Sequence, residues 1–150
     1  MANVTYCNAT RRYTFDHVLK VVSSVSEIPR VRGFLSDQLD KLGYSSKVKM
    51  NVCLCLEEAM TNAIEHGNLH GQPAIEVGVT ANNKVCILQV VDFGGFTFNP
   101  EYFEMLSEVR NWGHGGRGIF LIKCLMDEVY YFFHPGERTA VVMIKNKVSK

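Results

Sequence analysis

The sequence lacks a long apolar run and carries almost no net charge, and each absence excludes a class of function. No stretch approaches the roughly 20 consecutive apolar residues that a membrane-spanning helix requires. The 16 Lys and Arg against 15 Asp and Glu leave a formal net charge of +1, which gives no electrostatic basis for binding nucleic acid or a membrane surface. Residues 1–10 also lack the basic segment and the apolar stretch of a signal peptide. We therefore expect a cytoplasmic protein.

The number and spacing of the cysteines argue against disulfides and a zinc site. The count of five is odd, which is typical of reduced thiols in a cytoplasm when no secretion signal is present. Cys53 and Cys55 form a Cys-x-Cys pair, but no second pair completes a zinc site. We expect all the cysteines to be small residues in apolar surroundings. They are Cys7, Cys53, Cys55, Cys86 and Cys124.

The sequence does contain enough apolar material for one folded domain spanning residues 1–150. Hydrophobic residues make up 47% of the chain and charged residues 21%, which is ordinary for a globular protein. Hairpins with interspersed helices indicate an α+β domain, a two-layer sandwich with a mostly antiparallel sheet and helices on one face. The connection at 96–114 is long enough to act as a lid. Apolar spacing predicts strands at 4–7, 72–80, 84–91, 129–133 and 139–145, an interrupted helical region at 14–42, and helices at 47–66 and 119–126.

The predicted helix at 47–66 carries polar side chains on a segment that is otherwise apolar. Glu58, Asn62 and Glu65 are spaced by four and three residues, so they share one face of the helix. A carboxylate beside an amide can hold a divalent cation and a water molecule. The alternative is an ordinary solvated face on which Glu58 and Asn62 contact each other.

Two glycine-containing segments are further candidates for a binding site. Asp92 ends an apolar strand, where it can accept a hydrogen bond from an exocyclic amine, and Gly94 would let a flat ring approach the backbone. The alternative is a strand-ending turn, for which Asp-x-Gly-Gly is typical. The Gly-Gly-Arg-Gly run at 115–118 precedes a helix, whose unpaired amides and dipole favour an anion such as phosphate. A flexible hinge is the alternative for this run.

Two other motif matches do not have the context that they need. Residues 113–118 satisfy G-x-G-x-x-G, but a long connection rather than a strand precedes them, and Glu137, the acid near the expected distance, falls in a turn. His66 and His70 are four residues apart, but Gly67 is expected to end the helix that would align them as metal ligands.

The three candidate segments stand in an order that resembles the N, G1 and G2 boxes of the GHKL ATPase superfamily, which includes gyrase and the histidine kinases. Within it the chain looks most like the bacterial anti-sigma-factor serine kinases. Their N box is closely matched by 56–67, and their G2 box with its following helix by 115–129. The resemblance covers nearly the whole chain and implies the GHKL fold. The matching order is Glu58-x-x-x-Asn62, then Asp92-x-Gly94, then Gly115-Gly116-x-Gly118.

The resemblance implies a role for the residues that match its motifs. Asn62 would ligate a Mg²⁺ ion that bridges the phosphates of ATP. Glu58 would be the catalytic base that orients or deprotonates the attacking hydroxyl. Asp92 would bind the adenine amino group, Gly94 would let the base pack closely, and Thr139 would support adenine through a water molecule.

The glycine-rich run would hold the phosphates of the nucleotide in the same scheme. Gly115, Gly116 and Gly118 would donate their amides, and Arg117 would reach a phosphate or the partner. The implied function is an ATP- and Mg²⁺-dependent protein serine/threonine kinase, an anti-sigma regulatory factor that phosphorylates an anti-sigma-factor antagonist of the STAS type. A sigma factor is a further implied partner and a homodimer a further expectation. Neither nucleic acid nor a membrane is expected as a direct partner.

The G1 segment departs from the family pattern, because Phe96 stands where a second glycine is usual. This departure favours an alternative function, a domain that binds ATP as a switch and sequesters a regulator without transferring phosphate. A detached histidine-kinase ATPase domain fits less well, since no helix with a phosphoacceptor histidine precedes the N box.

Overall fold

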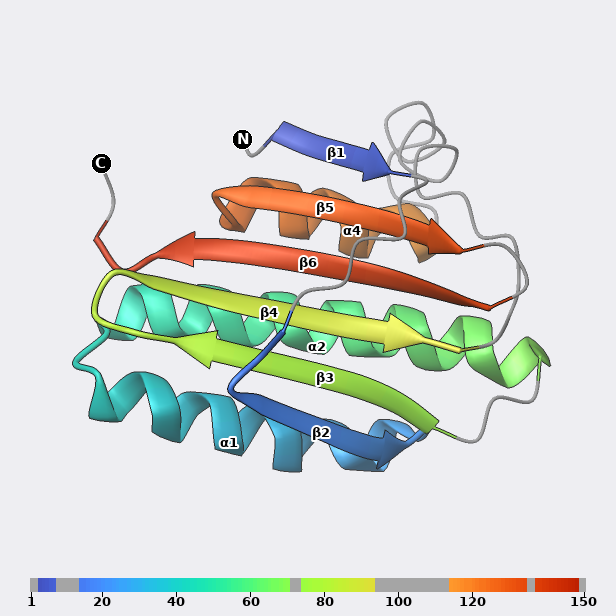
Figure 1. Cartoon of the computed structure of the whole chain (residues 1–150), viewed down its shortest axis with the longest axis horizontal. Helices are drawn as coiled ribbons and strands as arrows, with labels where there is room; N and C mark the ends of the chain where they lie inside the picture. Colours follow the sequence, from blue (N-terminus) through green and yellow to red (C-terminus); the bar gives the residue numbers. More distant parts are fainter. Residues whose placement is uncertain (1–2, 8–13, 71–73, 94–113, 135–136, 149–150) are drawn as a thin grey trace.

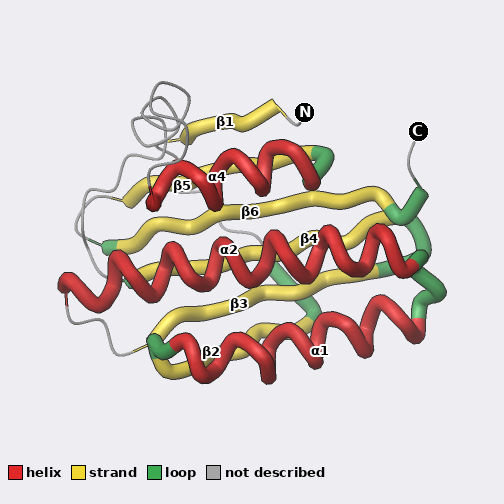
Figure 2. The backbone as a smooth tube through the Cα atoms, turned by 180° about the vertical axis from the view of Figure 1, so that it is seen from behind, coloured by secondary structure: helices red, strands yellow, loops and turns green. Residues whose placement is uncertain are grey.

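The structure is a computed structural model that describes residues 3–7, 14–70, 74–93, 114–134 and 137–148. These residues form two layers, a six-stranded sheet and three helices that cover one of its faces (Figures 1 and 2). The helices are α1 (Ile28–Lys41), α2 (Ser46–His70) and α4 (His114–Leu125). The strands are β1 (Asn3–Cys7), β2 (His17–Val22), β3 (Ala74–Ala81), β4 (Val85–Asp92), β5 (Glu128–His134) and β6 (Arg138–Asn146).

The strand order in the sheet is β1-β5-β6-β4-β3-β2. β1 runs parallel to β5, and the other neighbouring strands pair antiparallel. The prediction of an α+β sandwich with a mostly antiparallel sheet and helices on one face is therefore confirmed. All the strands predicted from apolar alternation are present, with ends shifted by at most two residues.

The region at 14–42, predicted as an interrupted helix, contains a strand that the prediction missed. β2 occupies its first part and pairs with β3, and a 3-10 turn at Val25–Glu27 leads into α1. Val21 is buried, whereas Val18 and Val22 are 60% and 63% exposed, so the side chains alternate between the two faces of the sheet. Over so few residues the apolar spacing fits either period, and the β-branched valines favour the strand.

The ends of the two long helices mostly follow local capping rules. α1 has Pro29 in its first turn and is followed by Gly43, whose φ of 73° suits the left-handed position that ends a helix. Ser45 precedes α2, and its Oγ accepts a hydrogen bond from the Val48 N–H at 3.2 Å. α2 continues past Gly67, its predicted end.

The hydrophobic core lies between the sheet and the helix layer. Alternate residues of β3 and β4 face the helices and are buried, and α2 runs along the middle of the sheet (Figure 2). This packing fixes the position of α2 relative to β4 and β6, where the candidate site residues lie. The largest buried side chains include Leu35, Leu39, Leu56, Met60, Leu88, Ile119, Ile122 and Met143.

The opposite face of the sheet has its own buried cluster, although none of the described helices covers it. The chain enters β2 across this face (Figure 1). The Phe15 ring lies against Gly78, and the Asp16 N–H donates a hydrogen bond to Thr80 Oγ1 at 2.9 Å. The cluster consists of Val91, Phe132, Ala140 and Val142.

The expectation of apolar surroundings for the cysteines is confirmed for three of the four that the structure describes as free thiols. Cys53, Cys55 and Cys86 are buried, and burial raises the pKa of the Cys55 and Cys86 thiols to about 12. The expectation was wrong for Cys124, which is exposed because it lies on the outer side of α4. Among the described residues, no group of His, Cys, Asp and Glu could hold a metal ion, and no helix is long and apolar enough to cross a membrane.

Candidate functional site

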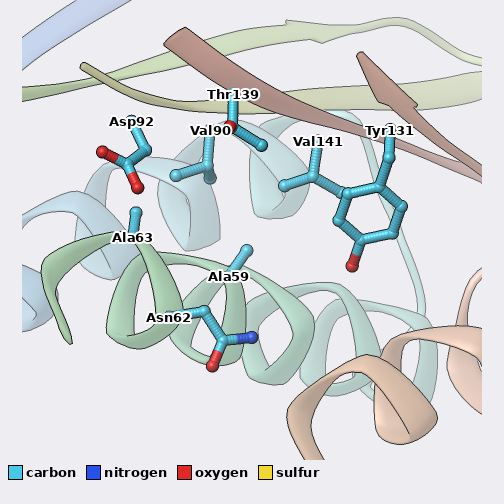
Figure 3. Close-up of a pocket in the computed structure, with 8 residues that line it drawn as sticks. All are labelled: Ala59, Asn62, Ala63, Val90, Asp92, Tyr131, Thr139 and Val141. Atoms are coloured by element: carbon cyan, nitrogen blue, oxygen red, sulfur yellow. The ribbon is translucent and has the colours of Figure 1, made fainter. Parts of the chain in front are cut away.

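A pocket opens between α2 and the sheet, near the end of β4 and the start of β6 (Figure 3). It encloses about 370 Å³ of empty space, counting the part that is open to solvent. Its walls come from α2, β4, β5 and β6, so it exists only where the two layers of the fold meet. The lining residues are Ala59, Asn62, Ala63, Val90, Asp92, Tyr131, Thr139 and Val141.

One end of the pocket combines two polar groups from neighbouring strands. Asp92 on β4 and Thr139 on β6 are direct partners in the antiparallel register, and both line the pocket. Figure 3 shows the Asp92 carboxylate directed into the space between the sheet and α2. The walls beside it are apolar, with Val90 from β4 and the small side chains of Ala59 and Ala63 from α2. This combination suits a flat ring that carries an amine on its edge.

Glu58 and Asn62 meet α4 at a single glycine. Asn62 lines the pocket from α2, and Glu58 lies one helical turn earlier on the same face. A Cβ atom added to Gly118 would lie 2.9 Å from Glu58 Oε2 and 3.0 Å from Asn62 Nδ2. The backbone of α4 therefore packs directly against both polar groups, and the structure brings two predicted site residues of α2 next to a third, Gly118, from a distant part of the chain.

The neighbouring carboxylate of Glu57 is engaged on the other side of α2. Its Oε1 atom accepts a hydrogen bond from Arg32 Nη1 of α1 at 2.9 Å. Because successive residues of a helix point about 100° apart, Glu57 faces α1 while Glu58 faces α4. Glu65, which was predicted to share the face of Glu58, is exposed and is not among the residues that line the pocket.

The helix after the glycine-rich run starts earlier than predicted, at His114 rather than at 119. Gly115 and Gly116 fall in its first turn, where backbone N–H groups have no acceptor within the helix. They are thus placed as a phosphate site would need them. Gly118 is the fifth residue of α4, and in a regular α-helix its N–H bonds to the carbonyl of His114. The amide role implied for all three glycines therefore suits the first two better than Gly118.

Several predicted features lie outside what the structure describes. Gly94 and residues 96–113 of the connection predicted at 96–114, with Phe96 among them, fall outside the described residues. The backbone of Arg117 belongs to α4, but its side chain is likewise not described. The roles implied for Gly94 and Arg117 stay predictions.

Sequence reasoning missed Tyr131 as a lining residue of the pocket. Its side chain is 4% exposed, and Figure 3 shows its ring next to Val141, away from Asp92. The signal that could have found it is the alternation along β5, in which Val129 and Tyr131 both point to the core side. That alternation does not reveal that the ring borders a pocket, since this depends on the small residues of α2 opposite the sheet.

Comparison with known proteins gives a match to the family model described as the histidine kinase-like ATPase domain, over residues 21–145. A protein called serine-protein kinase RsbW from Bacillus subtilis strain 168 is 27% identical over 137 residues, which cover 85% of this chain and 84% of the relative. The protein of the same name from Bacillus licheniformis is 27% identical over 133 residues, which cover 78% of each chain.

A solved structure shares the fold. It is titled as the SiaB–SiaC complex from Pseudomonas aeruginosa, and the match has a TM-score of 0.65 with 14% identity, covering 86% of this chain and 88% of the other. The family match contains Glu58, Asn62, Asp92 and Gly118, the residues that surround the pocket or adjoin it. The chain therefore belongs to the family of histidine kinase-like ATPase domains.

Proposed function

We propose that the chain is a protein serine/threonine kinase that uses ATP and Mg²⁺ to phosphorylate an anti-sigma-factor antagonist of the STAS type. The observation that carries the proposal is the packing of α4 at Gly118 against Glu58 and Asn62, next to a pocket that Asn62 and Asp92 both line. The two relatives named as serine-protein kinases support the same reaction class.

The chemistry of the pocket suits an adenine base. The Asp92 carboxylate would accept a hydrogen bond from the exocyclic amine, and Thr139 beside it would support the same edge of the base. Ala59 and Ala63 leave room for a ring on the helix side, and Val90 provides an apolar wall on the sheet side. A charged acceptor is expected to strengthen such a hydrogen bond relative to a neutral one.

The residues around the start of α4 suit the phosphates and the metal. The first-turn amides of Gly115 and Gly116, together with the helix dipole, favour negative charge at this position. Asn62 would hold Mg²⁺ through its side-chain oxygen. When bound, this ion supplies neutralisation of the phosphate charge during transfer. Glu58, one turn away on α2, would orient the substrate hydroxyl and accept its proton.

The partners follow from the resemblance rather than from contacts in the structure. The resemblance implies a sigma factor as a second partner and a homodimer, and we include these in the proposal together with the cytoplasmic location expected from the sequence. The solved structure with the same fold is a complex with SiaC by its title, so a domain of this shape also occurs bound to a partner.

Phosphoryl transfer to a purified antagonist tests the proposal directly. STAS-type antagonists from the same organism are incubated with the chain, ATP and Mg²⁺, and the modified residue is identified by mass spectrometry. We expect phosphate on a Ser or Thr. Glu58→Gln is expected to bind ATP but to lower the transfer rate by about 10²–10⁴-fold, because it removes the base.

Glu57→Gln is the matched control for that variant. It makes the same chemical change one residue away, on a side chain that Arg32 holds toward α1, and should keep transfer. Equal transfer rates in the parent protein and in Glu58→Gln would contradict the role given to Glu58.

The sequence at 92–100 favours a second candidate, in which ATP binding controls the capture of a partner and no phosphate is transferred. The basis is Phe96 in place of the second glycine of the G1 box. The same experiment separates the two functions. A complex that depends on nucleotide and yields no phosphorylated product would support the switch.

A further inference from the structure

Gly118 occupies a position where the backbone itself does not need glycine. It lies inside α4, and among the described glycines the positive φ belongs to Gly43, not to Gly118. Alanine is preferred over glycine by an α-helix at such an interior position. The reason for glycine at 118 must therefore be sought in the surrounding space and not in backbone geometry.

The surrounding space contains the two polar groups of the site. The added Cβ would stand 2.9 Å from Glu58 Oε2, 3.0 Å from Asn62 Nδ2 and 3.5 Å from Asn62 Oδ1. Real Cβ atoms essentially never lie within 3.0 Å of such an atom. The Glu58 carboxylate and the Asn62 amide thus occupy the space that a side chain at position 118 would need.

We infer that Gly118 is a positioning residue, which lets α4 pack on Glu58 and Asn62 and thereby fixes where the base and the metal ligand sit. This inference rests on the proposed kinase function for its catalytic consequence, but its structural part does not. It assigns Gly118 a role separate from phosphate binding, which the amides of Gly115 and Gly116 can serve from the first turn.

The identity of the contacted atoms determines what a methyl group at 118 would change. Glu58 Oε2 and Asn62 Nδ2 are the far ends of flexible side chains, so they can move away while the helices stay in place. The fold should therefore survive Gly118→Ala, and the arrangement of the site should not. Gly33 in α1 offers the matched control, because an added Cβ there meets nothing within 4 Å.

The first test needs neither nucleotide nor activity. The side-chain amide signals of Asn62 are recorded by NMR for the parent protein, Gly118→Ala and Gly33→Ala, all without ligand. We expect a clear shift of the Asn62 signals in Gly118→Ala, none in Gly33→Ala, and an unchanged melting temperature or a rise in both variants. Unmoved Asn62 signals in Gly118→Ala would overturn the inference, and so would loss of the folded spectrum.

The second test measures the catalytic consequence with the antagonist and ATP. A displacement of about 1 Å in a reacting group can cost about 10²-fold in rate. We expect Gly118→Ala to lower kcat by that order, while the affinity for ADP measured without Mg²⁺ and the KM for the antagonist stay close to the parent values. A fall in ADP affinity with kcat unchanged would instead show Gly118 as a phosphate-binding residue and overturn the inference.

A shorter acid at position 58 supplies the rescue. Glu58→Asp withdraws the carboxylate by one methylene group, away from a new methyl group at 118. We expect the double variant Gly118→Ala/Glu58→Asp to be more active than the product of the two single effects predicts. Multiplicative effects would contradict the inference. If the parent protein transfers no phosphate at all, the kinase proposal fails, and the NMR comparison still decides the packing role of Gly118.

Discussion

At the scale of single residues, the site depends on the direction in which each side chain points. Val91 and Asp92 are neighbours on β4, yet Val91 is fully buried in the cluster on the helix-free face, while Asp92 lines the pocket. Glu57 and Glu58 are likewise neighbours on α2, yet Glu57 points toward α1 and Glu58 toward α4. The sequence identifies these residues by type and spacing, but the pairing of β4 with β6 and the packing of α2 between α1 and α4 determine which one reaches the site.

Asp92→Asn tests the base-binding end of the pocket. Replacing the charged acceptor by an amide, which can still accept through its oxygen, should weaken a hydrogen bond to the adenine amine by about 1–1.5 kcal/mol, or about 5–10-fold in Kd. Calorimetric titration of ATP with Mg²⁺ measures this. Asp40→Asn is the control, since Asp40 pairs with Lys49 at 2.7 Å on the exposed side of α1. Equal affinity in parent and Asp92→Asn would show that nucleotide, if bound, does not use this pocket.

At the scale of elements, local capping was predictable and the choice between helix and strand was not always so. Pro29, Gly43 and Ser45 act through their own or adjacent backbone groups, which is why their roles follow from the sequence. β2 was mistaken for helix because its six residues show too few repeats to distinguish the two periods. Its strand conformation depends on hydrogen bonds to β3, and no feature of residues 17–22 indicates that they pair with β3.

Gly78→Ala tests the contact that holds the segment before β2 on the sheet. An added Cβ would lie 2.7 Å from two ring atoms of Phe15, and one of these is the first ring carbon, which cannot move freely. We expect a loss of about 1–3 kcal/mol in the free energy of unfolding, as for an overpacked core, measured by urea denaturation. Gly33→Ala should gain up to about 1 kcal/mol, because its helix position is open.

Phe15→Leu provides the complementary variant for this contact. In the double variant Gly78→Ala/Phe15→Leu the smaller, more flexible side chain should recover part of the lost stability. Strictly additive losses would mean that the two residues do not press on each other.

At the scale of the whole molecule, the burial of thiols makes the free energy of unfolding depend on pH in the alkaline range. The pKa of Cys55 and Cys86 is raised by burial from 9.0 to about 12, so these thiols keep their protons in the folded state until about pH 12. In the unfolded state they lose them near pH 9. Between these values the unfolded chain binds fewer protons, and the free energy of unfolding must fall as pH rises.

The expected slope is about 1.4 kcal/mol per pH unit for each buried thiol above pH 9. Urea denaturation at a series of pH values from 7 to 10.5 measures it. Cys86→Ala should reduce the slope, and Cys124→Ser, at an exposed position, should not. A free energy of unfolding that stays constant above pH 9 would contradict the burial of these groups.

The sequence by itself determined the class of fold and the strands of the sheet except β2, and it predicted Glu58, Asn62, Asp92, Gly115, Gly116 and Gly118 as site residues. It could do so because alternation, capping and box order are local or strictly ordered along the chain. Only the tertiary structure decided that Tyr131 borders the pocket and that the lack of a side chain at Gly118 leaves room for Glu58 and Asn62. These facts arise where α2, α4 and the sheet meet, and contacts between elements depend on packing distances that no spacing along a single chain encodes.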